Sequence, residues 1–519
     1  MKKLFTILFL IAIFSNISIL TFANEVTDKN LESDAINYSD DEIIVILTNE
    51  ESIKGNKYTV DSFAGINCVS VDDLTSSFNS LESKNFKRIL KLSLSNIDNV
   101  TLNRYIDELN ERNDVYYAGY NYEIEDMNFQ NELSYNQTNN MPRTNSIDLW
   151  GLDCINITQA RNFISSYNKS IVKVGVVDYG VEVHKELSNI VMPDLSYSFV
   201  NQGNNENNSS SDDYKAVHGT MVAGIIGSRV DNKNMEGVCS DVKIGSLEVD
   251  IQHDLTNNQL LHVDSVISAI NYAVSKNMRI INCSFGFEIA DIALYNAMKN
   301  FNGLFVCGAG NSYNNVDSGL INEKPLYPAA YDLNNIVSVG AINVQKQIWH
   351  ETIQGIEIGS NYGTISVDVF APGVNIQSTS IKNTYSYDTG TSFAAPYVTG
   401  IAAMILSIEN YCDNAPFSGN DLREIIMMSA TQSNNLSSLC RTSGYVDAKR
   451  ALEIALSYEY NPSYEYHNDT YHKVLPYLGS TFYEDHTWVP MNSSNFSKAV
   501  PIFPLMYECS KCKATKLGS

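Results

Sequence analysis

The sequence is poor in cysteine and in basic residues. Nine cysteines in 519 residues are too few for a dense disulfide framework, and Cys283 and Cys307 lie in apolar runs typical of buried thiols. Lys and Arg total 35 against 59 Asp and Glu, which gives a formal net charge of −24. This charge argues against a nucleic-acid partner.

Long apolar runs are scarce, and the one that approaches membrane-spanning length is at the N-terminus. Residues 1–23 combine Lys2 and Lys3 with an apolar stretch from Leu4 and a small-residue pattern at Thr21-Phe22-Ala23. These features are typical of a cleaved secretory signal, and a membrane anchor is the competing interpretation. We predict a protein that is secreted or held at the extracellular surface, with no stable membrane span after signal removal.

The length and composition predict a globular protein of about three structural units, because 44% of the residues are hydrophobic and 18% are charged. Within residues 24–125, strand patterns at 40–48 and 114–121 flank helical spacing at 102–109. This arrangement predicts a small α+β module. Residues 126–149 are polar and rich in Asn, which predicts an exposed linker that contains a processing site.

From residue 150 to residue 457, strand patterns alternate with helical patterns. The strand patterns are almost continuously apolar, as in a parallel sheet covered on both faces. They predict a doubly wound, mostly parallel α/β sheet. The predicted strands are 172–177, 242–247, 278–284, 303–308 and 336–341, with a helix at 263–274.

Three residues at the ends of these elements form a candidate catalytic set. Asp178 follows a strand, His218 opens an apolar helix and Ser392 opens another. An imidazole can take the proton of a hydroxyl near neutral pH, and a buried carboxylate can orient that imidazole. Taken singly, the serine is better explained as a helix cap, and the histidine as a cap or a satisfied core residue.

A fourth candidate follows another strand. Gly308, Ala309 and Gly310 lead to Asn311 after an apolar run. A side-chain amide at this position could donate a hydrogen bond to a developing oxyanion. An ordinary turn is the alternative, because asparagine after glycine is common in turns.

Together, the four motifs and their order resemble those of the subtilisin-like serine peptidases. The resemblance covers about residues 150–455 and extends to the segments 360–363 and 369–373. Two departures stand next to the motifs: Phe393 replaces the usual Met, and Met221 the usual His. Neither removes a reacting group, so they bear on substrate preference.

The resemblance implies a role for each candidate. Ser392 would be the nucleophile, His218 the general base and then acid, and Asp178 the group that orients it. Asn311 would donate to the oxyanion together with the backbone N–H of Ser392. Catalysis of this type needs no cofactor, and the partners are protein or peptide substrates.

The resemblance also implies where a substrate binds. An extended peptide would pair with the backbone at Ser284, Phe285 and Gly286. Gly308, Ala309 and Gly310 would line the pocket for the residue before the scissile bond. The small residues leave room for a large side chain, but they do not identify which one.

The module at 24–125 resembles a propeptide, the protein's own inhibitor until it is cut, and a permanent accessory domain is the alternative. Structural calcium is expected by resemblance only, because no local loop in this sequence spells a calcium motif.

The tail at 458–519 leaves the peptidase pattern. His486, Cys509 and Cys512 supply ligand types for zinc, but one C-x-x-C pair is half a structural site. A disulfide between Cys509 and Cys512 is an equal alternative, and Cys412 with Cys440 is another possible pair. The metal content of the tail is left open.

We predict an exported serine endopeptidase made as a precursor. A catalytically silent binding protein on the same fold is the first rival, because a fold alone does not guarantee activity. A sedolisin-type peptidase is the second, but it would need a carboxylate base and an acidic oxyanion donor. The presence of His218 and Asn311 argues against a sedolisin-type peptidase.

Overall fold

The structure, a computed structural model, describes most of residues 37–457 and six short strands after them. The described ranges are 37–54, 57–78, 87–95, 97–125, 150–200, 216–230, 235–249, 252–253, 259–320, 324–353, 355–411 and 417–457. The chain divides into two compact units, Met1–Tyr38 and Ser39–Ser519. The predicted signal at 1–23 and linker at 126–149 lie outside the described residues.

The N-terminal module is built around the apolar run Ile43–Leu47, which is fully buried in a strand. This strand, β1, pairs antiparallel with β3, which in turn pairs antiparallel with β2. The helix α3 begins at an N-cap, Asp98, whose Oδ1 accepts a hydrogen bond of 2.7 Å from Thr101 N. The elements are β1 (Asn37–Leu47), α2 (Asn49–Lys54), β2 (Cys68–Asp73), β3 (Ile89–Leu94), α3 (Asn99–Asn110) and β4 (Val115–Glu125).

The sheet of the module continues into the second half of the chain. Its strand order is β2-β3-β1-β4-β9-β8, so β9 (Gln259–His262) and β8 (Gln252–His253) extend it. Strand β4 pairs antiparallel with β9, with Ile124 opposite Leu261. The predicted α+β module is therefore joined edge to edge with a strand of the larger region.

The larger region contains a nine-stranded sheet in the order β18-β19-β15-β12-β11-β10-β5-β7-β6. Its described pairings are parallel except for β18 with β19. The strands are β5 (Val172–Asp178), β6 (Tyr197–Ser198), β7 (Val242–Glu248), β10 (Ile280–Cys283), β11 (Leu304–Gly308), β12 (Ile336–Ile342), β15 (Val369–Pro372), β18 (Thr431–Gln432) and β19 (Gly444–Tyr445). The predicted mostly parallel sheet is confirmed.

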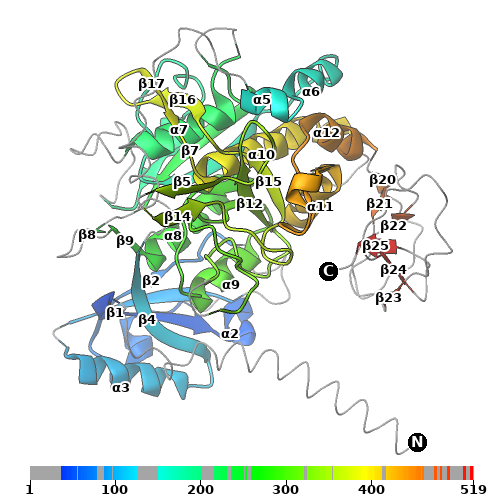
Figure 1. Cartoon of the computed structure of the whole chain (residues 1–519). Helices are drawn as coiled ribbons and strands as arrows, with labels where there is room; N and C mark the ends of the chain where they lie inside the picture. The colour runs from blue at the N-terminus through cyan, green and yellow to red at the C-terminus, as the bar shows by residue number, and fades with distance from the viewer. Residues whose placement is uncertain are drawn as a thin grey trace, which may run out of the picture. The chain divides into compact units, whose positions relative to one another are not determined.

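Alternate residues of these strands enter two different cores. Ile280 belongs to the cluster under α7 and α10, whereas Ile281 belongs to the cluster under α8 and α9. Figure 1 shows these two helix pairs on opposite sides of the sheet. The helices are α7 (Ala216–Gly227), α8 (Val263–Ser275), α9 (Ile292–Asn300) and α10 (Thr391–Ser407).

The order of connections changes direction at the carboxyl end of β5. From β5 the chain passes over one face through α7 to β7, and then over the other face through α8 to β10. Because β7 and β10 lie on opposite sides of β5, the direction of the winding reverses there. Ligands of doubly wound sheets bind at such a reversal.

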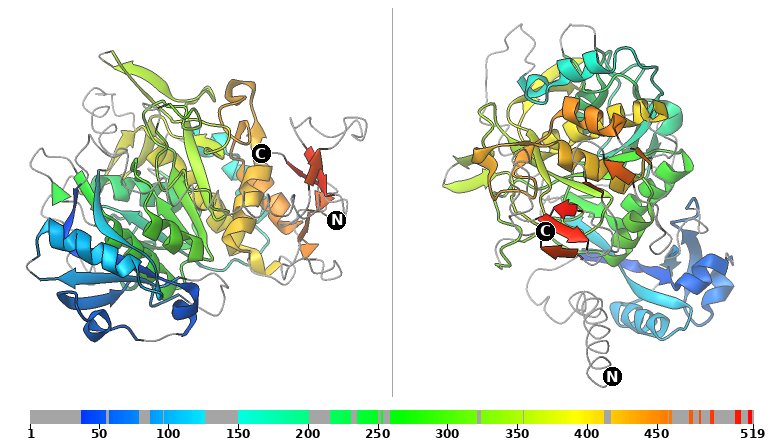
Figure 2. Two further views of the ribbon diagram at one scale, coloured as in Figure 1. Left: turned by 90° about the horizontal axis from the view of Figure 1, so that it is seen from below. Right: turned by 90° about the vertical axis from the view of Figure 1, so that its right-hand side faces the viewer.

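The remaining elements complete the surface of this region. Helices α10, α11 and α12 pack against one another, as the yellow to orange ribbon in Figure 2 shows. These elements are α5 (Trp150–Cys154), α6 (Ile157–Phe163), β13 (His350–Ile353), β14 (Ile356–Gly359), β16 (Ile376–Ser380), β17 (Thr384–Asp388), α11 (Gly419–Ser429) and α12 (Ala448–Leu456).

The strands beyond residue 457 are short. They are β20 (Glu459–Tyr460), β21 (Lys473–Leu475), β22 (Ser480–Thr481), β23 (Trp488–Pro490), β24 (Met506–Cys509) and β25 (Thr515–Leu517). Within the part of the chain that the structure describes, no helix has the length and apolar character needed to cross a membrane.

Candidate active site

Asp178 and His218 meet at the carboxyl end of β5. His218 Nδ1 lies 2.9 Å from both carboxylate oxygens of Asp178, and both side chains are buried. The approach depends on Gly219, because a Cβ atom there would lie 2.2 Å from the carbonyl oxygen of Gly180 and 3.0 Å from Asp178 Oδ1. The carboxylate can therefore fix the orientation of the imidazole and stabilise its protonated form.

Two aromatic rings lie near the imidazole of His218. The ring of Phe393 lies 5.4 Å from that of His218, centroid to centroid, and the ring of Tyr179 lies 6.2 Å from it. Phe393, which was expected to bear on substrate preference, therefore packs near the histidine itself. Met221 is fully buried in the core, and Ser386 Oγ donates to its sulfur at 3.2 Å.

Ser392 is the second residue of α10, and its side chain is fully buried. Its hydroxyl donates to the backbone carbonyl of Ser284 at 3.1 Å rather than to His218. In return, Ser284 Oγ donates to the backbone carbonyl of Ser392 at 2.9 Å. The first turn of α10 is therefore bound from two directions to the end of β10.

Asn311 follows β11 and faces the start of α10. Its Oδ1 accepts hydrogen bonds from Thr391 N at 2.9 Å and from Thr391 Oγ1 at 3.0 Å. Because Oδ1 accepts both donors, the orientation of the amide is fixed, and Nδ2 is turned away from Thr391. Gly310 reaches this position with φ of 107°, a conformation that favours glycine. This geometry suits a donor aimed at a nascent oxyanion.

The predicted peptide-binding segment directly follows β10. Ser284 contacts Ser392 as described above, and Phe285 has its side chain buried in the cluster under α8 and α9. A Cβ atom on Gly286 would lie 2.3 Å from Leu326 Cδ2. Phe285 can therefore meet a peptide only through its backbone, and the predicted binding role of this segment stays a prediction.

Gly308, Ala309 and Gly310 are buried beside the start of α10. Asn361 Nδ2 donates to the carbonyl of Ala309 at 3.0 Å, and Asn361 N donates to the carbonyl of Gly310 at 2.8 Å. A Cβ atom on Gly308 would lie 3.1 Å from Thr391 Oγ1. These residues lie next to Asn311 as expected, but their role as a pocket wall stays a prediction.

Sequence reasoning missed three polar residues around Ser392. Thr391 orients Asn311, and Asn282 and Thr399 are fully buried side chains that contact each other at 2.8 Å. A signal for two of them existed in the sequence. Asn282 interrupts an apolar strand, and Thr399 interrupts an apolar helix; such residues need buried hydrogen-bond partners.

A cluster of polar side chains connects the N-terminal module to the start of α8. Asp264 Oδ2 lies 2.7 Å from Lys91 Nζ, and Asp264 Oδ1 accepts from Asn121 Nδ2 at 3.0 Å. Asn121 Oδ1 also accepts from Asp264 N at 3.3 Å, and Glu42 lies 3.2 Å from Lys91. Burial by itself lowers the pKa of the Lys91 ammonium, but the two carboxylates raise it above its ordinary value of 10.5 overall.

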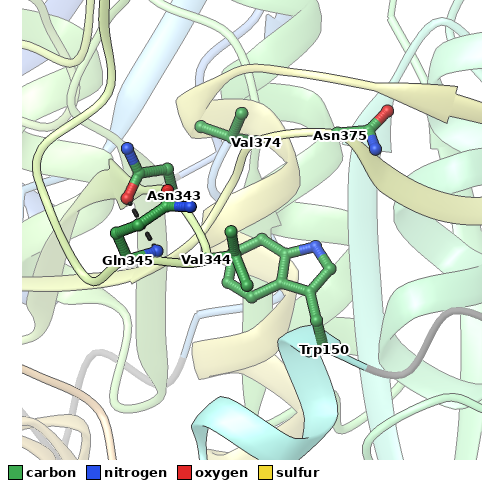
Figure 3. A pocket seen from close by; sticks show the side chains of 6 residues that line it. All are labelled: Trp150, Asn343, Val344, Gln345, Val374 and Asn375. Atoms are coloured by element: carbon green, nitrogen blue, oxygen red, sulfur yellow. Dashed lines mark hydrogen bonds between the residues drawn. The ribbon is translucent and has the colours of Figure 1, made fainter.

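Figure 3 shows a pocket of about 370 Å³ that none of the predicted site residues lines. Trp150 and two valines form its apolar walls. Asn343 Oδ1 accepts a hydrogen bond of 3.0 Å from Gln345 N at its rim. The lining residues are Trp150, Asn343, Val344, Gln345, Val374 and Asn375.

Metal sites rich in charged side chains are absent from the described residues, where no three His, Cys, Asp or Glu side chains gather. A calcium site among these residues would have to use backbone carbonyls and amide side chains. The Cys440 thiol is free, with its sulfur 3.6 Å from the carbonyl oxygen of Gly444, which contradicts the possible pair with Cys412. His486 and Cys512 lie outside the described residues.

Comparison with known proteins gives consistent matches to one family. Residues 169–446 match the model of the Subtilase family. The chain is 31% identical to "Subtilisin-like protease 2" of Plasmodium falciparum over 281 residues, 52% of this chain and 19% of that protein. It is 32% identical to the "Major intracellular serine protease" of Bacillus subtilis over 243 residues, 46% of this chain and 69% of that protein.

A solved structure supports the same fold. Fervidolysin from Fervidobacterium pennivorans, described as a keratinolytic enzyme related to subtilisin, superposes with a TM-score of 0.56 at 22% identity, covering 81% of this chain and 62% of that one. The chain thus spans about a fifth of the Plasmodium falciparum relative and more than half of the others. The family model covers more than half of the chain, so the chain belongs to the Subtilase family.

Proposed function

We propose that this protein is a secreted serine endopeptidase that hydrolyses peptide bonds through Ser392, His218 and Asp178. The observation that carries the proposal is the 2.9 Å contact between His218 and Asp178 beside the start of α10. In the reaction, the Ser392 hydroxyl first breaks its hydrogen bond to the Ser284 carbonyl. Its oxygen then attacks the substrate carbonyl while its proton passes to His218 Nε2. His218 then donates this proton to the leaving amine.

Asn311 and the N-terminus of α10 stabilise the tetrahedral intermediate in this proposal. Asn311 Nδ2 and Ser392 N–H donate to the oxyanion, and the positive end of the helix dipole of α10 adds to the attraction. The support comes from the two hydrogen bonds by which Thr391 orients the Asn311 amide. Water then hydrolyses the acyl-enzyme with His218 as the base.

The substrate is a protein or peptide in extended conformation, which pairs with the backbone at residues 284–286. Gly308, Ala309 and Gly310 border the pocket for the side chain before the cut. Support comes from the contacts that both segments make with the first turn of α10, from Ser284 to Ser392 and from Gly308 to Thr391. Catalysis uses no metal, and structural calcium is proposed from the family resemblance alone. A melting temperature unchanged by a chelator would contradict the calcium proposal.

The protein is made as a precursor whose N-terminal module inhibits it. Support comes from the pairing of β4 with β9 and from the polar cluster around Asp264. Ile44, Ile46, Leu74 and Ile89 of the module also share one hydrophobic cluster with the inner faces of α8 and α9. Burial of these apolar side chains favours continued binding of the module after the linker is cut.

Intact-mass spectrometry of the secreted wild type and of Ser392→Ala tests the proposal. Each protein is measured with and without a serine-directed fluorophosphonate. We expect only the wild type to be shortened within 126–149 and to gain one adduct. If the wild type stays full-length and unlabelled, the module is removed and the labelling repeated. A protein that gains no adduct after this removal would favour the catalytically silent binding protein. An adduct on Ser392→Ala would assign the nucleophile elsewhere.

A further inference from the structure

A line of buried polar groups runs from the middle of α10 back to its first turn. Thr399 and Asn282 are fully buried, and each stands among apolar neighbours of its own element. A threonine in a helix commonly bonds a carbonyl of the preceding turn. Thr399 Oγ1 instead donates across to Asn282 Oδ1 on β10, at 2.8 Å.

The hydrogen bonds continue in one direction. Asn282 Nδ2 donates to Ser284 Oγ at 2.8 Å, and Ser284 Oγ donates to the carbonyl of Ser392 at 2.9 Å. Each hydroxyl proton is committed to the next group, so reversing the Asn282 amide would break two hydrogen bonds. Such a chain of buried hydrogen bonds has one stable arrangement, and its members reinforce one another.

This series of hydrogen bonds begins and ends on the same helix, α10. Thr399 lies seven residues, about two turns, after Ser392. Both are attached to the end of β10, which leads into the predicted peptide-binding segment. These hydrogen bonds therefore tie the first turn of α10 to the segment on which a peptide is predicted to lie.

We infer that Thr399, Asn282 and the side chain of Ser284 are positioning residues for Ser392. The inference rests on the proposed role of Ser392 as nucleophile. The three residues hold Ser392 at attacking distance from a peptide on residues 284–286 and do not themselves exchange protons with it. Small displacements of reacting atoms slow acylation strongly and alter binding little, so kcat is the sensitive quantity.

Thr399→Val tests this inference, because valine keeps the shape of threonine and removes the hydroxyl. The rate of inactivation by a fluorophosphonate, per titrated active site, and kcat and KM on a chromogenic peptide are measured on the processed protein. We expect the acylation rate and kcat to fall about 10-fold, the usual scale for a buried partner left unsatisfied, with KM within about two-fold. Thr399→Ser, which restores the hydroxyl, should recover most of the rate.

Ser407→Ala is the matched control. Ser407 is a buried residue of the same helix. Its hydroxyl donates to the carbonyl of Met404 at 2.8 Å and takes no part in the series of hydrogen bonds that leads to Ser392. The acylation rate of Ser407→Ala should stay within about two-fold of the wild-type rate. Equal rates for Thr399→Val and wild type, or equal losses in Thr399→Val and Ser407→Ala, would overturn the inference.

A double-mutant cycle gives a second, independent test. Thr399→Val and Ser284→Ala break the same chain, so the double variant should lose little more rate than Ser284→Ala alone. Fully additive losses would also overturn the inference. Labelling of Ser392→Ala marks failure of the proposed function, whereas an unlabelled Ser392→Ala with a wild-type rate in Thr399→Val marks failure of the positioning role alone.

Discussion

Helices α10 and α8 begin at the same edge of the sheet, but side chains of different kinds bind their first turns. The first turn of α10 is bound by neutral hydroxyl and amide groups of the same region, from Ser284 and Asn311. The first turn of α8 is bound through Asp264 by charged and polar groups of the N-terminal module, chiefly Lys91 and Asn121.

The two kinds of contact suit different lifetimes. Neutral buried hydrogen bonds keep their arrangement over a wide pH range and hold the candidate nucleophile during every reaction cycle. A partly buried ion pair gains attraction but also requires both ions to lose water. It suits a contact between two parts of the chain that would separate after the proposed processing.

Removing the amide of Asn311 should have the largest effect. Asn311→Ala leaves the nucleophile and base intact but removes the side-chain oxyanion donor, so kcat should fall about 100- to 1000-fold, a magnitude measured on subtilisin itself. KM should change far less. Asn335→Ala, which removes an amide that bonds Met298 and Phe301 carbonyls, is the control and should keep its turnover. Wild-type activity in Asn311→Ala would remove this residue from the site.

Neutralising Asp264 should have an intermediate effect. In Asp264→Asn the shape is kept, but Lys91 loses its closest carboxylate, so a module cut within 126–149 should be retained about 10- to 100-fold more weakly. Recovery of activity on dilution of the cut protein measures this retention. The control, Glu108→Gln, removes an exposed ion pair within α3 and should leave retention unchanged. Equal retention in Asp264→Asn and wild type would show that the apolar contacts alone hold the module.

A third helix start, that of α9, should give the smallest effect. Asp291 caps α9 by accepting from Leu294 N at 2.7 Å, and burial raises the pKa of its carboxyl to about 6 despite this bond. Because the folded-state pKa lies above the ordinary 3.8, this group's contribution to stability is complete below about pH 4 and is lost as the pH rises through 6. Asp291→Asn should therefore melt about 2–4 °C higher than wild type at pH 7.5 and close to it at pH 4.

Asp98 provides the control of opposite sign. It caps α3 at an exposed site, and hydrogen bonds from Thr101 lower the pKa of its carboxyl below 3.8. Its contribution to stability is present above that value and is lost as the pH falls. Asp98→Asn should therefore bring no gain at pH 7.5. A gain of the same size in both variants would contradict the assignment of the Asp291 effect to burial.

The sequence by itself determined the elements that carry the candidate site. The apolar runs of β5, β10 and β11 and the helix starts at His218 and Ser392 follow from local patterns, which backbone geometry and side-chain type decide within a few residues. The order of the four motifs was sufficient to indicate the family. The parallel sheet followed because helices separate its strands.

Only the tertiary structure decided which partners the polar groups chose. Local spacing does not reveal that Thr399 donates to Asn282 or that the Ser392 hydroxyl rests on the Ser284 carbonyl. Nor does it reveal that β9 and β8 extend the sheet of the module, or that the ring of Phe285 is buried in the core. These contacts join residues far apart in the chain, and they form because a buried donor or a strand edge must find whatever partner the packed elements bring within reach.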